Sequence, residues 1–106
     1  MKDTLFLKII NRELPAEIIY ENEFVIVIKD IHPQAPIHYL IIPKKQFKTI
    51  SDIPSNEFIY IDELFKAAQQ LSKTIKNAEE FKLIINNGEK AGQCIFHLHM
   101  HFLSGF

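Results

Sequence analysis

Three histidines alternate with large apolar residues near the end of the chain, in the segment Phe96-His97-Leu98-His99-Met100-His101-Phe102. Side chains of a β-strand point alternately to its two faces, so this period of two predicts a strand whose three imidazoles share one face. We expect the strand to run over residues 94–103. The residues of its other face are expected to pack on the core: Phe96, Leu98, Met100 and Phe102.

Hydrophobic periodicity predicts the remaining elements. Apolar residues at helical spacing, followed by Pro15, predict a short helix over residues 4–11. A longer apolar stripe that includes Phe65 predicts a helix over residues 55–77, with Ser55 as its N-cap. Strands are predicted over residues 18–21, 24–29, 37–42 and 81–85.

The strand over residues 24–29 is apolar at consecutive positions, so we expect both of its faces to be covered. The order of elements favours an α+β fold, a five-stranded antiparallel sheet with one long and one short helix. Such a sheet leaves one face and one edge uncovered, which favours a dimer.

The chain has 106 residues, and we predict a single domain over residues 1–106. Its net charge of −1 gives no general attraction to nucleic acid or to a membrane surface, so a phosphate site would need local, oriented donors.

No apolar stretch approaches the ~20 residues of a membrane span, and the first apolar run is too short for a signal peptide. A single cysteine, Cys94, excludes an intramolecular disulfide framework. Together these features favour a cytoplasmic protein.

The row of imidazoles has three interpretations: a polar surface without chemistry, a metal site, or covalent catalysis. Alternate residues of a strand lie ~6.6 Å apart, so His97 and His101 would be separated by ~13 Å, whereas Zn–N bonds are only ~2.0–2.1 Å long. A metal site would therefore need a ligand from elsewhere, with His38, His32 or Cys94 as candidates. Covalent catalysis is open to imidazole because its ordinary pKa of ~6.5 leaves much of it neutral and nucleophilic at pH 7. In that case the flanking histidines could bind phosphate oxygens when charged.

The loop over residues 86–93, Asn86-Asn87-Gly88-Glu89-Lys90-Ala91-Gly92-Gln93, leads directly into the histidine segment. Its two glycines allow the backbone to approach a ligand closely, and successive N–H groups in such a turn can form an anion-binding nest. A plain hairpin connection is the alternative interpretation.

From Asn86 through Gly92-Gln93 to Leu103, the chain resembles the signature of the histidine triad (HIT) family, with the three histidines at the family's spacing. The segment that begins at Asp3, and Asp30-Ile31-His32-Pro33-Gln34-Ala35-Pro36-Ile37-His38, resemble the Hint branch of that family. Asn86 also favours this branch, because the branch that hydrolyses dinucleoside polyphosphates has glutamine there.

The resemblance implies a five-stranded antiparallel sheet with two helices and a homodimer with a continuous sheet. It implies transfer of a nucleoside monophosphate onto the middle histidine, followed by hydrolysis, with nucleoside phosphoramidates and mixed adenylates of AMP or GMP type as substrates. No metal or other cofactor is implied. The alternatives are a dinucleoside polyphosphate hydrolase and a non-catalytic nucleotide-binding or scaffold protein.

The resemblance also implies catalytic roles. His99 would be the nucleophile, and the carbonyl of His97 would accept a hydrogen bond from its other ring nitrogen. His38 would contact His97 from the neighbouring strand. His101 would bind the phosphate or the leaving group.

The nucleotide itself would be bound by residues of several segments. Gln93 and the backbone around Gly92 would bind phosphate, and Asp30 would accept hydrogen bonds from the ribose hydroxyls. The base pocket would be lined by Phe6, Ile9, Ile28 and Ile31.

This sequence departs from the family pattern in three ways. Cys94 stands where serine or threonine usually contacts the phosphate or leaving group, and a thiol is a weaker donor. His32 stands where Hint relatives tend to have serine, and it has no assigned role. The sequence ends at Phe106, whereas Hint relatives often continue with a tail that bears tryptophan.

Overall fold

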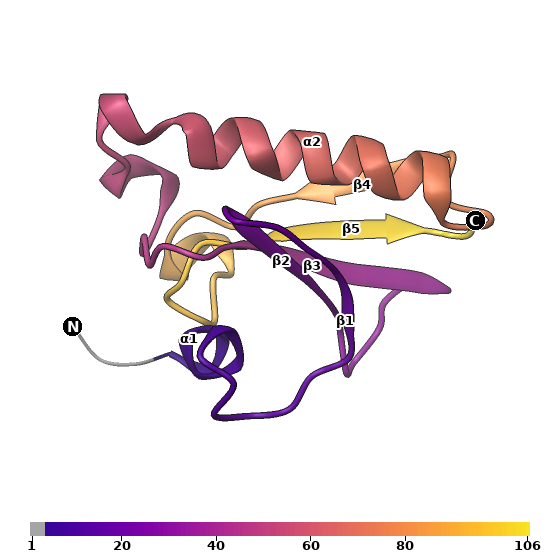
Figure 1. Ribbon diagram of the computed structural model, residues 1–106, viewed down its shortest axis with the longest axis horizontal. Coiled ribbons are helices and arrows are strands. Elements are labelled where there is room, and N and C mark those ends of the chain that lie inside the picture. The colour runs from indigo at the N-terminus through magenta and orange to yellow at the C-terminus, as the bar shows by residue number, and fades with distance from the viewer. Residues whose placement is uncertain (1–3) are drawn as a thin grey trace.

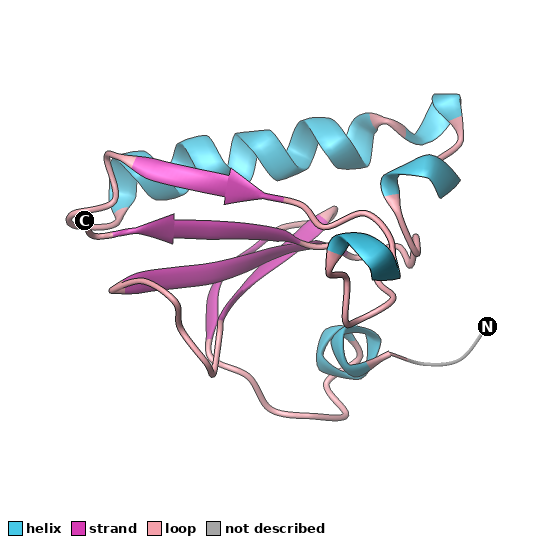
Figure 2. Cartoon of the chain, turned by 180° about the vertical axis from the view of Figure 1, so that it is seen from behind, coloured by secondary structure: helices cyan, strands magenta, loops and turns pink. Residues whose placement is uncertain are grey.

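The computed structural model describes residues 4–106, so Asp3 lies outside the described part. The five predicted strands form one antiparallel sheet in the order β1-β2-β3-β5-β4 (Figure 1, Figure 2). The strands are β1 (Ile18–Glu21), β2 (Val25–Lys29), β3 (Ile37–Pro43), β4 (Phe81–Ile84) and β5 (Met100–Ser104). The helices are α1 (Leu5–Ile10) and α2 (Ile59–Thr74), and short 3-10 turns occupy Ile50–Asp52, Ser55–Glu57 and Glu89–Ala91.

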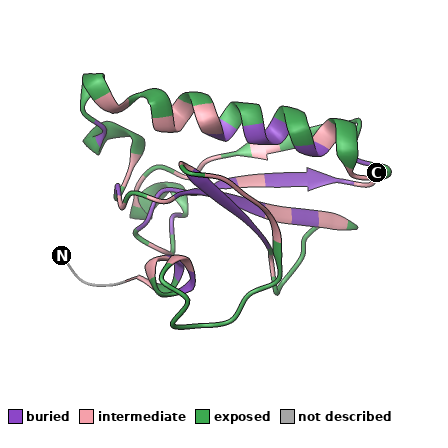
Figure 3. Ribbon diagram, in the orientation of Figure 1, coloured by how far each residue is buried: buried purple, intermediate pink, exposed green. Residues whose placement is uncertain are grey.

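The two helices cover opposite faces of the sheet, with the long helix α2 along one face and α1 beneath the other (Figure 1). Alternation along β2 divides the core accordingly. Val25 and Val27 belong to the cluster on the α2 side, whereas Ile26 and Ile28 belong to the cluster that includes Phe6 of α1. The prediction that this strand is covered on both faces is confirmed, and all four residues are buried (Figure 3).

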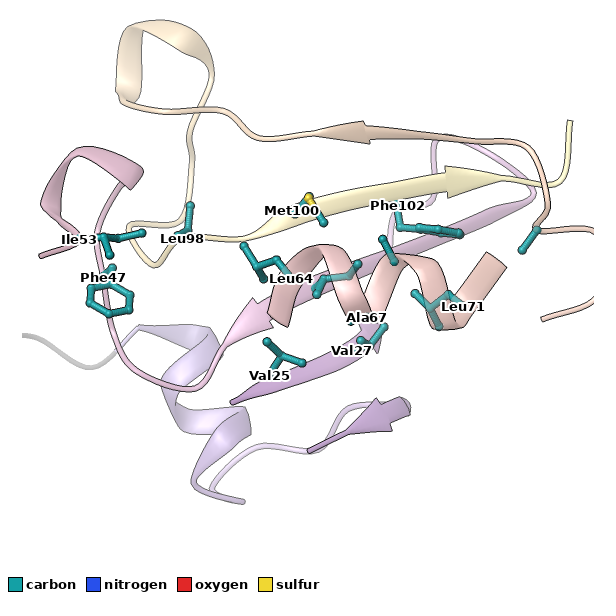
Figure 4. Packing of buried hydrophobic residues seen from close by; sticks show 13 residues of the cluster. Val25, Val27, Phe47, Ile53, Leu64, Ala67, Leu71, Leu98, Met100 and Phe102 are labelled. Atoms are coloured by element: carbon teal, nitrogen blue, oxygen red, sulfur yellow. The ribbon is translucent and has the colours of Figure 1, made fainter. Parts of the chain in front are cut away.

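The larger cluster lies between α2 and the sheet (Figure 4). Leu64, Ala67, Ala68 and Leu71 are the buried residues of α2. Phe65, which the stripe predicted to be apolar core, is 53% exposed. It lies one residue, or 100° around the helix, from Leu64 and so falls at the side of the helix, outside the buried stripe.

The long helix begins later than predicted, and Ser55 is not its N-cap. Ser55 is the first residue of a separate 3-10 turn, which closes with a hydrogen bond from the Glu57 N–H to the Pro54 carbonyl at 2.9 Å. The α-helix itself spans Ile59–Thr74. Among residues 4–106, no helix is long and apolar enough to cross a membrane.

The last strand is shorter than the predicted range of 94–103, because β5 begins at Met100. In the ladder with β3, Ile41 pairs with Met100, so continuing the register by two residues would place Leu98 opposite Pro43. Proline has no backbone N–H and cannot donate to such a ladder. The N–H of Leu98 instead donates to the carbonyl of Phe47 at 2.7 Å.

Candidate active site

The three imidazoles lie together on the α1 side of the sheet, even though only His101 belongs to β5. The ring centroids of His99 and His101 are 5.2 Å apart, and the Phe6 ring lies edge-on to His99 at 4.9 Å and to His97 at 6.0 Å. Leu98 and Met100 point into the opposite cluster, as predicted. Phe96 does not, since it precedes the strand, lies in a bend and is 40% exposed.

The hydrogen bond of His99 determines which of its nitrogens is basic. Nδ1 lies 2.8 Å from the carbonyl oxygen of His97, which is the contact that the resemblance to the HIT family implied. A carbonyl can only accept, so Nδ1 carries the proton, and the neutral ring keeps its lone pair on Nε2. Burial lowers the pKa of His99, although its bond to the His97 carbonyl and the nearby charge of Asp30 oppose that shift. His99 is therefore a neutral imidazole with a basic Nε2.

His97 is fully buried and is held at both ring nitrogens. Its Nε2 donates to the carbonyl of Pro43 at 2.8 Å, and its Nδ1 lies 3.3 Å from Oγ1 of Thr4. Burial lowers the pKa of His97, with the Pro43 bond acting in the opposite direction and His99 adding to the decrease. The ring is accordingly neutral with its proton on Nε2.

The predicted contact between His38 and His97 is wrong, because His38 contacts His101 instead. The backbone N–H of Gln34 donates to Nδ1 of His38 at 2.9 Å, so the proton of a neutral His38 is on Nε2. That nitrogen lies 2.9 Å from Nδ1 of His101 and donates to it. The lone pair of His101 is thereby engaged, and its own proton is on Nε2.

Burial, His99 and His38 together lower the pKa of His101 to about 4. The ring is therefore neutral at pH 7. This differs from the expectation that a flanking histidine would bind phosphate as a cation. His101 offers a phosphate an N–H donor from a neutral ring.

Asp30, His38 and His101 form the group of described residues with spacing suited to a metal, with their potential ligand atoms within 4.8 Å of one another. The hydrogen bonding of His38 does not fit that use. A metal on Nε2 would require the proton on Nδ1, and a metal-bound histidine normally donates from that second nitrogen. Here Nδ1 already faces the N–H donor of Gln34. The other two candidate ligands, His32 and Cys94, are exposed outside this group.

A cavity of about 640 Å³ opens beside Phe6, the residue whose ring contacts His97 and His99. It brings together Phe6, Ile9, Ile28, Asp30 and Ile31, the residues predicted to bind the nucleoside. Ile31 is 83% exposed and so forms part of the rim. No pattern in the sequence predicted the other lining residues: Leu5, Pro15, Ala16, Glu17, Lys29, His32, Pro33, Leu40 and Ile95. Proximity in the fold, rather than a motif, assembles this group.

Both glycines of the loop over residues 86–93 have positive φ angles. Gly88 and Gly92 have φ angles of +100° and +98°, a region that other residues rarely adopt. The side chain of Asn86 lies directly against Gly92, where an added Cβ would be 3.8 Å from its Cγ. The thiol of Cys94 is exposed and contacts the Gly92 carbonyl at 3.5 Å.

Gln93 braces this loop from inside the protein. Its Oε1 accepts the Gly88 N–H at 2.8 Å, and its Nε2 donates to the carbonyls of Lys48 at 2.7 Å and Ile95 at 3.0 Å. Both amide hydrogens are used, and the residue is buried. The Gln93 side chain thus has no free donor for a phosphate, in contrast to the expectation from sequence.

Comparison with known proteins agrees with this geometry. A model of the HIT domain family matches residues 11–106. The purine nucleoside phosphoramidase of Escherichia coli is 36% identical over 98% of this chain and 88% of its own length.

Two solved structures extend the comparison. A HIT family hydrolase from Clostridium thermocellum is 44% identical with a TM-score of 0.94, over 100% of this chain and 93% of that one. A hypothetical histidine triad nucleotide-binding protein from Sulfolobus tokodaii is 38% identical with a TM-score of 0.83, over 95% of this chain and 68% of that one. The chain therefore belongs to the histidine triad (HIT) domain family.

Proposed function

We propose that the protein is a nucleotidyl hydrolase that acts at the α-phosphate of purine nucleotide derivatives, through a covalent intermediate on His99. The observation that carries this proposal is the hydrogen bond between Nδ1 of His99 and the His97 carbonyl, which leaves Nε2 basic. The Phe6 ring links this imidazole to the cavity, since it contacts His99 and lines the cavity wall. The name of the Escherichia coli relative supports phosphoramidates as substrates.

In the proposed first step, Nε2 of His99 attacks the α-phosphorus. A nitrogen–phosphorus bond forms as the bond from phosphorus to the leaving amine breaks, and the amine departs with the bonding electron pair and takes a proton from solvent. The Nε2–H of His101 donates a hydrogen bond to the phosphate or the leaving atom. Water then attacks the phosphorus, releases the nucleoside monophosphate and restores His99.

The nucleoside part would occupy the cavity. Asp30 lies in its wall, and a carboxylate can accept hydrogen bonds from both ribose hydroxyls. Phe6, Ile9 and Ile28 provide an apolar surface for a purine ring. The backbone around Gly92 would lie against the phosphate. In the structure the N–H groups of Ala91, Gly92 and Gln93 donate to carbonyls of the same loop at 3.0–3.1 Å, so they would bind phosphate only after exchanging these partners.

Turnover of adenosine phosphoramidate by purified variants tests the mechanism. His99→Asn should abolish hydrolysis and still bind AMP, because the change leaves the cavity intact, whereas His101→Asn should slow the reaction less severely. Lys66→Asn, on the exposed face of α2, serves as the control and should keep full activity. Full activity in His99→Asn would refute the mechanism.

Two further outcomes would replace the proposed function with one of the alternatives. A wild-type rate on diadenosine polyphosphates that exceeds the rate on phosphoramidates would favour the dinucleoside polyphosphate hydrolase. Slow turnover of every substrate with retained AMP binding would favour a nucleotide-binding protein whose site has lost its chemistry.

We further propose that the protein is a homodimer with a continuous sheet, joined along β4. This strand forms one edge of the sheet. It carries two large apolar side chains that are partly exposed, Phe81 at 37% and Ile84 at 41%, and Phe65 of α2 is 53% exposed. A second copy that pairs with this edge would cover such surface.

We also propose a cytoplasmic location. The single cysteine, Cys94, is a free thiol, and free thiols are typical of a reducing compartment.

A further inference from the structure

The hydroxyl of Thr4 makes two contacts, one with a backbone N–H of α1 and one with a ring nitrogen of His97. As the N-cap of α1, its Oγ1 accepts a hydrogen bond from the Leu7 N–H at 3.1 Å. The same oxygen lies 3.3 Å from Nδ1 of His97. A hydroxyl has one hydrogen to donate and two lone pairs, so one side chain can satisfy both contacts at once.

The direction of the second contact follows from the other side of the His97 ring. Its Nε2 donates to the Pro43 carbonyl, so Nδ1 of the neutral ring has no hydrogen and can only accept. Thr4 is therefore the donor. His97 is 0% exposed, so bulk water does not reach this nitrogen in place of the hydroxyl.

Two consequences connect this hydrogen bond to His99. A donor at Nδ1 stabilises the neutral form of His97 and disfavours a cation beside the nucleophile. The ring is also anchored at both nitrogens, which fixes the residue whose carbonyl accepts the Nδ1–H of His99. Through Phe6, the same short helix also lines the nucleoside cavity.

We propose that Thr4 is a positioning residue for the triad. Its hydroxyl holds His97 neutral with the proton on Nε2, and thereby holds the carbonyl that orients His99. This inference rests on the proposed function for its effect on turnover. Its effect on the protonation of His97 stands independently.

Three substitutions separate the donor from the helix cap. Thr4→Ser keeps both the cap and the donor. Thr4→Asp keeps a capping oxygen but can only accept at neutral pH, and Thr4→Val loses both. Each variant is compared with wild type by thermal unfolding, by steady-state hydrolysis of adenosine phosphoramidate, and by ¹⁵N NMR of the histidine ring nitrogens.

We expect Thr4→Ser to match wild type in kcat and in the His97 spectrum. Thr4→Val should lower kcat by about 2- to 13-fold, the range that corresponds to one hydrogen bond, with KM nearly unchanged. Its His97 Nδ1 resonance should move toward the position of a nitrogen with no hydrogen-bond donor. Thr4→Asp should shift the same resonance in the opposite direction, toward a protonated nitrogen, and lower kcat although α1 is still capped.

The proposal is overturned if Thr4→Asp keeps the wild-type resonance and rate, or if Thr4→Ser fails to restore what Thr4→Val loses. It is also overturned if the His97 resonance moves as expected while kcat of Thr4→Val and Thr4→Asp stays at the wild-type value. If wild type itself fails to hydrolyse the phosphoramidate, the proposed function fails. The expected His97 resonances would in that case still support the link from Thr4 to His97.

Discussion

Acidification should destabilise the fold through His101. The pKa of this imidazole is lowered from 6.5 to about 4 by burial and by the neighbouring His99 and His38. Above pH 6.5 the residue is neutral in both the folded and the unfolded chain. As the pH falls from 6.5 to 4, the unfolded chain binds a proton here that the folded chain does not, so the free energy of unfolding decreases. At pH 5 this decrease amounts to at most about 2 kcal/mol.

The substitution His101→Asn tests this magnitude. The amide oxygen of asparagine can replace Nδ1 as the acceptor for the Nε2–H of His38, and the amide does not titrate. Urea unfolding at pH 7 and pH 5, at one fixed protein concentration, gives the loss of stability on acidification. We expect the wild type to lose more stability than His101→Asn, by up to about 2 kcal/mol.

His32→Asn is the matched control, because His32 is exposed outside the triad. Its loss of stability between the two pH values should equal that of the wild type. If His101→Asn and the wild type lose stability equally, His101 does not have a lowered pKa in the folded chain. The argument that it meets phosphate as a neutral donor would then be wrong.

Three other substitutions have defined outcomes. Gln93→Met should lower the free energy of unfolding by roughly 3 kcal/mol in urea, because it removes the three hydrogen bonds that this buried side chain makes to the backbone. Gln70→Met, at an exposed position of α2, should change it little. Leu64→Ala should cost about 2–5 kcal/mol in the same assay, because Leu64 is fully buried in the cluster beneath α2. Phe65→Glu should convert the proposed dimer to a monomer in light scattering, whereas Gln70→Glu should not, and an unchanged mass in Phe65→Glu would contradict the proposed interface.

The sheet and its helices could be predicted because their hydrophobic periods are local and long enough to read. The start of β5 could not, since it depends on which residue of β3 faces it. Pro43 reaches the position opposite Leu98 only once the register of the two strands is known. Similarly, the α2 stripe was too wide at Phe65, because the width of the buried face depends on how the helix packs on the sheet.

The contacts of the site also fall into two groups: those within one segment, and those that depend on how distant segments pack together. The hydrogen bond from His99 to the His97 carbonyl spans two residues, and the resemblance to the HIT family implied it. The partner of His38 was not, because the register pairs His38 with Leu103 and so makes it a diagonal neighbour of His101. His97 lies beyond the end of that ladder. The contact of Thr4 with His97 joins residues 93 positions apart, and it depends on the docking of α1, which no local pattern records.

In the proposed reaction, Nε2 of His99 becomes covalently bonded to the nucleotide during turnover. Wild-type protein can be mixed with excess adenosine phosphoramidate, quenched in denaturant at alkaline pH within one turnover, and analysed by mass spectrometry of the intact chain and its peptides. We expect an adenylyl adduct on the peptide that contains residues 97–101, assigned to His99 by fragmentation and absent from His99→Asn. Turnover by wild type with an adduct at another residue, or adduct formation and turnover that persist in His99→Asn, would contradict the proposed reaction.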